Sequence, residues 1–298
     1  MPALRILITG GSGLLGQYLN KALSQKYEIL TCWNKHQGNC TDYPNLRLDL
    51  TNNDKITGTV REFQPDVIVH AAAFASPILP PEISTAYVNQ VNVTATALLA
   101  KLAQEQVARM IYTSTDLVYA GYRGSMLTES AKLVPLSLYA ETKLIGEGKV
   151  ARECENHVIL RTSLMYGIGL NHAVSHFTGM VKALREGNPI KLFTDQIRTP
   201  LSYPDAARMI GEIIERSEIS GIYNFGGKDR LSRFEMGEIL CKLGGFDTSL
   251  LIPSSCRDIP NYPAVEDVSL NTDKLGESGI YANSYEHEVK TLLGNFSA

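Results

Sequence analysis

The stretch Arg5–Gly16 (RILITGGSGLLG) decides the fold that we expect of this chain. Its first five residues are mostly apolar, which is typical of a strand buried on both faces of a parallel sheet. Gly10, Gly13 and Gly16 follow at the spacing G-x-x-G-x-x-G, and apolar residues then recur at helical spacing. A strand, a glycine turn and a helix in this order present free N–H groups and a positive helix end to a pyrophosphate. We therefore predict a dinucleotide-binding unit, with a plain tight turn as the alternative.

Strand and helix patterns alternate along the chain after this stretch. Strands that alternate with helices form βαβ crossovers, which build a parallel sheet with helices on both faces. The expected strands are Tyr27–Cys32, Leu46–Asp49, Pro65–His70, Arg109–Ser114 and His157–Arg161. The expected helices are Asn53–Phe63, Ala86–Gln104, Tyr139–Glu153 and Ala206–Glu215.

The predicted fold is α/β: a Rossmann-type doubly wound parallel sheet with a smaller, interleaved C-terminal substrate lobe. No linker rich in Pro, Gly or Ser divides the chain, so the lobe must come from insertions and from the C-terminal third. We assign residues 1–170 and 194–228 to the dinucleotide-binding domain, and residues 171–193 and 229–298 to the lobe.

The composition excludes several classes of protein. The 298 residues carry 28 Lys and Arg against 31 Asp and Glu, which argues against a nucleic-acid partner because phosphate backbones need clustered cations. No apolar run is long enough for a transmembrane helix and the start has no signal-peptide pattern, so we expect a cytoplasmic protein without a membrane partner. The five cysteines form no CxxC pair and the six histidines do not cluster, so we expect neither disulfides nor a metal site.

The end of the second expected strand bears on the choice of cofactor. Enzymes that bind NAD often place an Asp or Glu there for the ribose 2′-hydroxyl, whereas Thr31–Lys35 (TCWNK) has no acid. Lys35 is suited to a 2′-phosphate, which favours NADP(H) and leaves NAD(H) open; the alternative is a solvated loop lysine. Asp49, before Leu50, either accepts from the adenine amino group or caps the next helix. Ala71–Ala73 either let the cofactor approach the backbone or pack tightly.

Tyr139–Lys143 (YAETK) is the expected centre of the reaction chemistry. A tyrosine and a lysine four residues apart lie one helical turn apart on the same face. A cation beside the phenol lowers its pKa, so that the tyrosine exchanges a proton with a carbonyl or alcohol oxygen near neutral pH. Without the glycine loop, the same pair is more often an ordinary surface pair.

Hydroxyl side chains follow the expected strand Arg109–Ser114. The carboxyl end of a parallel strand faces the crevice in which ligands bind. Either Ser114 or Thr115 is therefore placed to hydrogen-bond the reacting oxygen, unless it is a cap or turn hydroxyl.

These motifs, in this order and spacing, resemble the extended short-chain dehydrogenase/reductase superfamily and, within it, the dTDP-4-dehydrorhamnose reductases. The resemblance covers most of the chain, through segments 9–16, 49–50, 65–73, 88–99, 114–119, 139–143 and 160–167. The marks of the subgroup are Ser114–Tyr119 (STDLVY), Leu160–Gly167 (LRTSLMYG) and Ser269–Leu275 (SLNTDKL).

The resemblance implies roles for individual residues. It makes Thr115, Tyr139 and Lys143 catalytic and places Ser114 and Asp116 beside the substrate. The predicted cofactor contacts are Gly10, Ser12, Gly13, Leu14, Leu15, Gly16, Lys35, Asp49, Leu50, Ala71, Ala72, Ala73, Tyr139 and Lys143.

Two positions depart from related patterns. The subgroup usually carries an acidic, lysine-containing stretch where this chain has the apolar Phe74–Pro81 (FASPILPP), which leaves the sugar open. Nucleotide-sugar dehydratases place a Glu where this chain has Leu117, which argues against water elimination.

Arg198 lies in a segment that resembles the part of sugar-nucleotide enzymes that contacts phosphates. It is expected either to contact the substrate's phosphates or to pair at the surface with Asp195 or Asp205. Asp205 itself is expected to cap the helix that follows it.

The sequence thus predicts an NAD(P)-dependent oxidoreductase that reduces a nucleotide-linked 4-keto-6-deoxy sugar. Two alternatives remain open: an epimerase with tightly held NAD, and a non-catalytic NADP-binding regulatory subunit that serves a partner enzyme. A homodimer is compatible with such folds, although no residue requires one.

Overall fold

A computed structural model of the chain describes residues 3–76, 78–122, 124–259 and 265–296. Pro77, which belongs to the segment Phe74–Pro81, lies outside these ranges, and so do residues 1–2, 123, 260–264 and 297–298 of the two predicted domains. The centre of the fold is a parallel sheet of seven strands in the order β11-β6-β5-β4-β1-β2-β3. The strands are β1 (Arg5–Thr9), β2 (Glu28–Trp33), β3 (Asn45–Arg47), β4 (Val67–His70), β5 (Arg109–Thr115), β6 (His157–Thr162) and β11 (Gly221–Phe225). The predicted α/β class with a doubly wound parallel sheet is confirmed.

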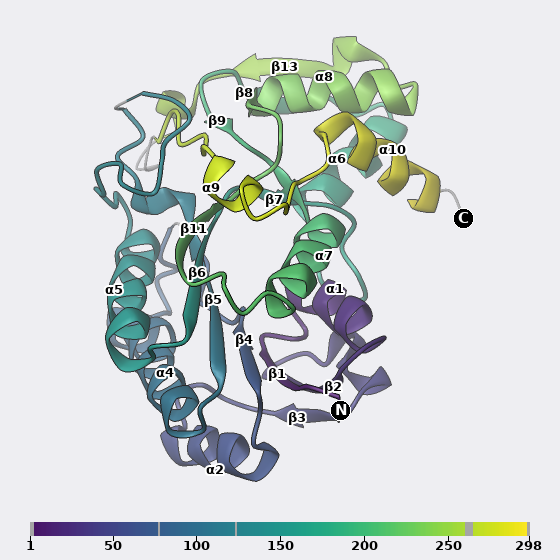
Figure 1. The fold of residues 1–298 in the computed structure, drawn as a ribbon. Coiled ribbons are helices and arrows are strands. Elements are labelled where there is room, and N and C mark those ends of the chain that lie inside the picture. Colours follow the sequence, from purple (N-terminus) through teal and green to yellow (C-terminus); the bar gives the residue numbers. More distant parts are fainter. Residues whose placement is uncertain (1–2, 77, 123, 260–264, 297–298) are drawn as a thin grey trace.

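Helices cover both faces of this sheet (Figure 1). One face packs against α1 (Leu14–Leu23) and α7 (Tyr203–Ile214), and the other against α2 (Asn53–Phe63), α4 (Ala95–Glu105) and α5 (Leu138–Glu153). The chain runs outward from β1 to β3 and then returns to start β4 on the other side of β1. Ligands of such sheets bind outside the carboxyl ends of the strands at this reversal of direction.

A smaller group of elements lies beyond the carboxyl ends of the strands, at the top of Figure 1. It contains α6 (His176–Arg185), α8 (Arg233–Gly244) and α10 (Tyr285–Phe296), with the two-stranded sheet of β8 (Ile190–Phe193) and β13 (Leu251–Ser254). These elements share a separate core that includes Phe177, Leu240 and Val289. The short strands β7 (Met165–Tyr166), β9 (Ile197–Arg198), β10 (Leu201–Ser202) and β12 (Leu231–Ser232) form two further pairs. The division into two domains at the stated residues stays a prediction.

The helix expected at Ala86–Gln104 is interrupted. It consists of α3 (Thr85–Asn89), a π-helical turn at Gln90–Thr94 and α4. The wider turn matches a set of side-chain bonds made by Asn92, which bonds the backbone N and O of Phe74 and the hydroxyl of Thr142 on α5. Periodicity alone did not indicate this turn, because its cause is a contact with distant segments.

The predicted cap of α7 is wrong. Ser202 is the N-cap and its hydroxyl accepts from the backbone N of Asp205 at 3.1 Å. Asp205 lies inside the first helical turn, where its buried carboxylate accepts from Arg208 and from the backbone N of Asn283. A carboxylate in the first turn still suits the positive helix end, so the local charge pattern is the same for both arrangements.

His70, at the end of β4, is a fully buried core residue. The hydroxyl of Thr96 donates to the carbonyl of Asn92, so it accepts from Nε2 of His70 at 2.9 Å. Nδ1 then accepts from the hydroxyl of Thr9 at 2.6 Å. The ring is therefore neutral, and burial together with the charge of Lys143 lowers the pKa of His70 to about 3.

This neutral imidazole makes stability depend on pH. The unfolded state binds a proton near pH 6.5 and the folded state does not until about pH 3, so stability present above pH 6.5 is lost as the pH falls between these values. We expect His70→Gln to flatten the fall of the unfolding free energy between pH 6.5 and 4.5 by about 1 kcal/mol per pH unit. Urea titrations measure this, with the exposed His287→Gln as control; equal slopes for the wild type and His70→Gln would contradict it.

Candidate active site

A cavity of about 350 Å³ lies over the carboxyl ends of β1, β2 and β4. The glycine loop, the residues after β2 and the alanines after β4 line it. Of the predicted cofactor contacts, it brings together Gly10, Ser12, Gly13, Lys35, Asp49, Leu50, Ala71, Ala72 and Ala73. Asp49 accepts from the backbone N and the hydroxyl of Thr51, whereas Asn52 caps α2, so the helix-cap alternative for Asp49 is wrong.

The three glycines of the G-x-x-G-x-x-G spacing, Gly10, Gly13 and Gly16, serve different steric needs. Gly10 has a φ of +73°, and a Cβ there would lie 2.8 Å from the backbone N of Ala72. A Cβ on Gly16 would lie 2.1 Å from the carbonyl oxygen of Gly10, so both glycines are required by packing. A Cβ on Gly13 would meet only that carbonyl, at 3.2 Å, and would otherwise enter the cavity.

The N-terminus of α1 fits an anion. Its N-cap, Gly13, makes no side-chain cap bond, and its first turn has no acidic residue. The helix N–H groups and the helix dipole therefore face the cavity without a protein anion to satisfy them. These residues fit the pyrophosphate of a dinucleotide.

A second cavity of about 520 Å³ continues the first and shares Gly13, Ala71 and Ala73 with it. It lies over the carboxyl ends of β5 and β6 and reaches the elements at the top of Figure 1. Its lining includes the predicted residues Leu14, Leu15, Ser114, Thr115, Asp116, Tyr139, Lys143 and Arg198. Gly16, buried beneath the loop, is the one predicted contact in neither lining.

Thr115 and Tyr139 face each other across this second cavity. A hydrogen bond from Thr115 favours the phenolate of Tyr139, but burial first and the charge of Asp116 second raise the pKa of Tyr139 to about 12. The expectation that Lys143 lowers this pKa is wrong for this structure, in which Nζ of Lys143 lies 4.0 Å from the centre of the Tyr112 ring. The phenol is therefore protonated at neutral pH.

Lys143 is buried in an uncommon state. Burial lowers the pKa of Lys143 to about 7, and the nearby carboxylate of Glu147 acts in the opposite direction. Glu147 accepts from Arg161 on β6 at 2.8 Å and from the hydroxyl of Ser114 at 2.5 Å. Because Ser114 is held by Glu147, Thr115 is the hydroxyl beside Tyr139. The cap alternative also holds for Thr115, whose hydroxyl accepts from the backbone N of Leu117 at 3.2 Å and caps the turn Asp116–Val118.

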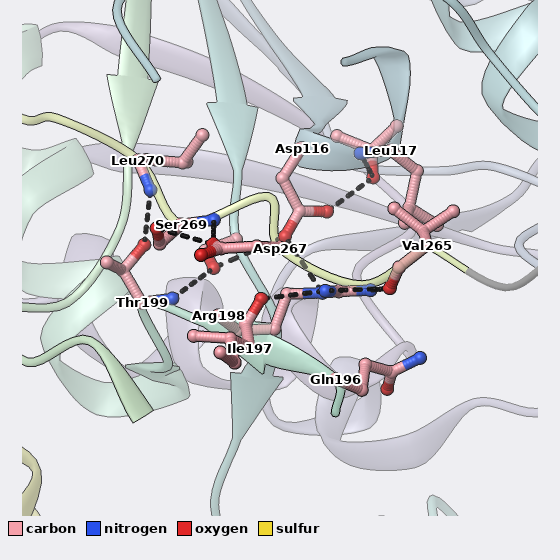
Figure 2. A network of polar contacts seen from close by, with 12 residues as sticks. Asp116, Leu117, Gln196, Ile197, Arg198, Thr199, Val265, Asp267, Ser269 and Leu270 are labelled. Atoms are coloured by element: carbon pink, nitrogen blue, oxygen red, sulfur yellow. Dashed lines mark hydrogen bonds and ion pairs between the residues drawn. The ribbon is translucent and has the colours of Figure 1, made fainter. Parts of the chain in front are cut away.

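Arg198 is held inside the molecule by acceptors of its own chain (Figure 2). It is 4% exposed, and its guanidinium lies 3.5 Å from the carboxylate of Asp116 and bonds the carbonyls of Ile197, Val265 and Glu266. The alternative of a surface pair with Asp195 or Asp205 is wrong, because the partner is Asp116. The contact with substrate phosphates stays a prediction, and the geometry gives Arg198 a second task, which is to hold Asp116 and the 265–266 backbone.

Sequence reasoning missed two residues in the second cavity. Arg233, at the start of α8, and Gln196, before β9, both line it, and Nε of Arg233 donates to the side chain of Gln196 at 3.1 Å. Ser232 and Glu235 predict the start of α8 as a capping box, but no local signal shows that this helix begins over the site.

Comparison with known proteins identifies the family. The model of the RmlD substrate binding domain matches residues 4–298. This chain belongs to that family. Its relatives include the methionine adenosyltransferase 2 subunit beta of Danio rerio, 31% identical over 259 residues, which cover 85% of this chain and 77% of the relative. They also include the dTDP-4-dehydrorhamnose reductase of Aggregatibacter actinomycetemcomitans, 31% identical over 239 residues, 78% of this chain and 76% of the enzyme.

A solved structure shares the fold along the whole chain. The dTDP-4-dehydrorhamnose reductase of Bacillus anthracis, crystallised in complex with NADP, matches with a TM-score of 0.86 and 24% identity over 99% of this chain and 100% of that one. Within the described ranges, no helix is long and apolar enough to cross a membrane. The same ranges hold no group of three or more His, Cys, Asp or Glu side chains placed for a metal.

Gly13 offers a test of the anion cradle that spares the fold. We expect Gly13→Ala to weaken the binding of NADPH and NADH at least tenfold, because the methyl group enters the cavity where the phosphates would lie. Isothermal titration calorimetry measures this. The control is Gly148→Ala on α5, where a Cβ meets nothing within 4 Å. Wild-type affinity in a folded Gly13→Ala protein would refute the assignment.

Proposed function

We propose that the protein is an NAD(P)H-dependent reductase of a nucleotide-linked 4-keto-6-deoxy sugar, with dTDP-4-dehydrorhamnose as the substrate that its relatives suggest. One observation carries this proposal: the cavity of the glycine loop opens directly into the cavity that contains Thr115, Tyr139 and Lys143. A dinucleotide that lies along the first cavity would bring its nicotinamide to the second. The substrate then lies between this ring and the elements that carry Arg233 and Gln196.

The cofactor, when bound, supplies the hydride for the keto carbon. Tyr139 donates the proton to the oxygen on which negative charge develops, because its raised pKa keeps the phenol protonated in the resting enzyme. Thr115 donates a hydrogen bond to the same oxygen, and both donors already line the second cavity. Such donors lower the barrier because the charge on the oxygen is larger in the transition state than in the substrate.

Lys143 prepares Tyr139 for the next cycle. With the cofactor bound, its ammonium would stabilise the phenolate left after proton donation and would hold the ribose hydroxyls of the cofactor. A lysine whose pKa is about 7 gives up a proton more readily than an ordinary lysine, so it suits a relay toward the tyrosine. The carboxylate of Glu147, one helical turn further along α5, favours the charged form of Lys143 and so opposes part of the effect of burial.

The cofactor of choice is NADP(H), with NAD(H) as the second. The last residue of β2 and the three that follow it line the first cavity: Trp33, Asn34, Lys35 and His36. None of these four is acidic, so none would repel a 2′-phosphate. The relative from Bacillus anthracis was crystallised with NADP. We further propose a cytoplasmic enzyme, as a monomer or a homodimer, without nucleic-acid partners.

The family also contains subunits that serve another enzyme, so the reductase must be distinguished from them. A subunit that only binds the cofactor needs the first cavity but no proton donor in the second. The presence of Thr115, Tyr139 and Lys143 in the lining of the second cavity therefore favours the enzyme. Loss of NADPH absorbance in proportion to the sugar nucleotide consumed identifies the reductase; product formed at constant absorbance identifies the epimerase. If the protein with bound cofactor turned over no keto-sugar nucleotide, the regulatory subunit would be the remaining hypothesis.

Tyr139→Phe removes the proton donor and keeps the ring. We expect kcat to fall by about 10²–10⁴-fold, the usual contribution of general acid catalysis, with NADPH affinity within twofold of the wild type. Stopped-flow loss of NADPH absorbance measures the rate. The control is Tyr281→Phe, whose side chain is exposed. A Tyr139→Phe enzyme with wild-type kcat would show that the role is wrong.

The pH dependence of kcat/KM for NADH, which lacks the 2′-phosphate, reports the titration of groups in the free enzyme. Lys143 is protonated below its pKa of about 7 and loses its charge above it, so we expect kcat/KM to be flat below pH 7 and to fall by up to tenfold per unit above. Lys143→Arg keeps its charge at these pH values, so its profile should stay flat to pH 9, whatever its absolute rate. The same fall in Lys143→Arg would exclude Lys143 as its origin.

A further inference from the structure

The adenosine end of the first cavity opens into a separate hollow. This hollow has a volume of about 420 Å³ and shares Trp33, Lys35, His36 and His172 with the cavity. A dinucleotide whose pyrophosphate lies at the N-terminus of α1 places its adenosine ribose over the end of β2. The hollow begins at that point, so it offers space beyond the 2′ position that an unphosphorylated ribose does not fill.

Two imidazoles from distant parts of the chain meet at this hollow. The ring centres of His36, which follows β2, and His172, which follows β7, are 4.6 Å apart with an angle of 32° between the rings. Burial and the neighbouring His36 lower the pKa of His172. The charged form of His172 is therefore disfavoured unless an anion lies beside the ring.

The segment that carries His172 is fastened to the glycine-loop helix. The fully buried Gln17 of α1 donates to the carbonyl of Leu170 at 3.0 Å and accepts from the side chain of Asn171 at 2.7 Å. The same side chain accepts from the backbone N of Asn39 at 3.1 Å. The two histidines are therefore brought together by a defined set of bonds around one glutamine.

The charged groups around the hollow favour an anion. Lys35 is exposed at its edge, and Arg47 of β3 donates to the carbonyl of Asn34 at 3.1 Å. Among the described residues, no ion pair is formed by either cation. The acids nearby are Asp42, at the end of the 3-10 turn Gly38–Asp42, and Asp49, which is held by Thr51. Arg47, Asp42 and Asp49 lie outside the lining of the hollow, which itself contains the cation Lys35, two titratable imidazoles and, in the part of the chain that the structure describes, no acid, while α1 contributes the uncharged Gln17.

We propose that Lys35, His36 and His172 form a 2′-phosphate subsite in which the two imidazoles bind as imidazolium ions. The proposal rests on the reductase function, because it assigns the residues that select NADP(H) over NAD(H) in that cofactor cavity. A phosphate monoester has charge of about −1.5 to −2 at pH 7, so it favours the charged form of an imidazole beside it, and its binding draws a proton from solution. Selection of the phosphorylated cofactor then strengthens as the pH falls through the range in which free histidine titrates.

The test uses two fragments that differ only in the phosphate: 2′,5′-ADP and 5′-AMP. Their Kd values are measured by calorimetry at pH 6.5 and pH 8.5, and the preference is the Kd of 5′-AMP divided by that of 2′,5′-ADP. One linked proton is worth up to tenfold per pH unit, so we expect the wild-type preference to be about tenfold larger at pH 6.5. The second ionisation of the phosphate acts in the opposite direction and is common to all variants.

The double substitution His36→Asn with His172→Asn should remove this pH dependence and leave the smaller, constant preference due to Lys35. Both side chains are exposed, so the fold and the affinity for 5′-AMP should be retained. The matched control is His287→Asn on α10. A wild-type preference that is equal at both pH values, or a pH dependence that survives in the double variant, would overturn the subsite.

The outcomes also separate this proposal from the function on which it rests. If 5′-AMP and NADH bind but the 2′-phosphate adds no affinity, the subsite is wrong and the reductase stands with NAD(H) as its cofactor. If neither fragment nor either cofactor binds, both proposals are wrong.

Discussion

The buried ion pair of Arg161 and Glu147 joins the elements on which the site depends. Arg161 lies on β6 and Glu147 on α5, and the two side chains are 3% and 4% exposed. Glu147 also accepts from Ser114 on β5, and Arg161 donates to the hydroxyl of Tyr119. Loss of one partner would leave the other charge buried, which costs about 3–5 kcal/mol. The pair thus fixes the relative positions of the strand that ends in Thr115 and the helix that carries Lys143.

The electrostatics of the crevice match a cofactor that brings negative charge. Burial lowers the pKa of Lys143 and raises that of Tyr139, so each group is driven toward its neutral form. Phosphates at the glycine loop would favour the ammonium form of Lys143 through their charge. A charged Lys143 would then favour the phenolate of Tyr139, as the sequence pattern suggested. That coupling is thus expected of the enzyme with its cofactor bound.

Local signals predicted most of the fold and part of the site. The helix Asn53–Phe63 was predicted to the residue, and the glycine loop, Tyr139 and Lys143 were found because each depends on spacing within a few residues. One error is local, the cap of α7, which is Ser202 and not Asp205. The other errors concern contacts with distant segments: the π-helical turn follows from Asn92 and Phe74, and Asp116 is the partner of Arg198. Arg233 and His172 reach the site from segments whose placement depends on the tertiary fold. No pattern within a short window contains that information.

A shared fold does not decide which reaction a member of this family performs, because the reaction depends on the residues at single positions of the site. Leu117 is one such position, because dehydratases that resemble this chain carry an acid there. In this structure Leu117 lines the second cavity and also packs against a small apolar core that includes Val118 and Val265. A carboxylate in its place would lie next to Asp116, whose burial already raises its pKa, and would leave that apolar contact. Among the described residues that line the second cavity, the one carboxylic acid is therefore Asp116, which is paired with Arg198, and this suits the reduction of a carbonyl better than the removal of water.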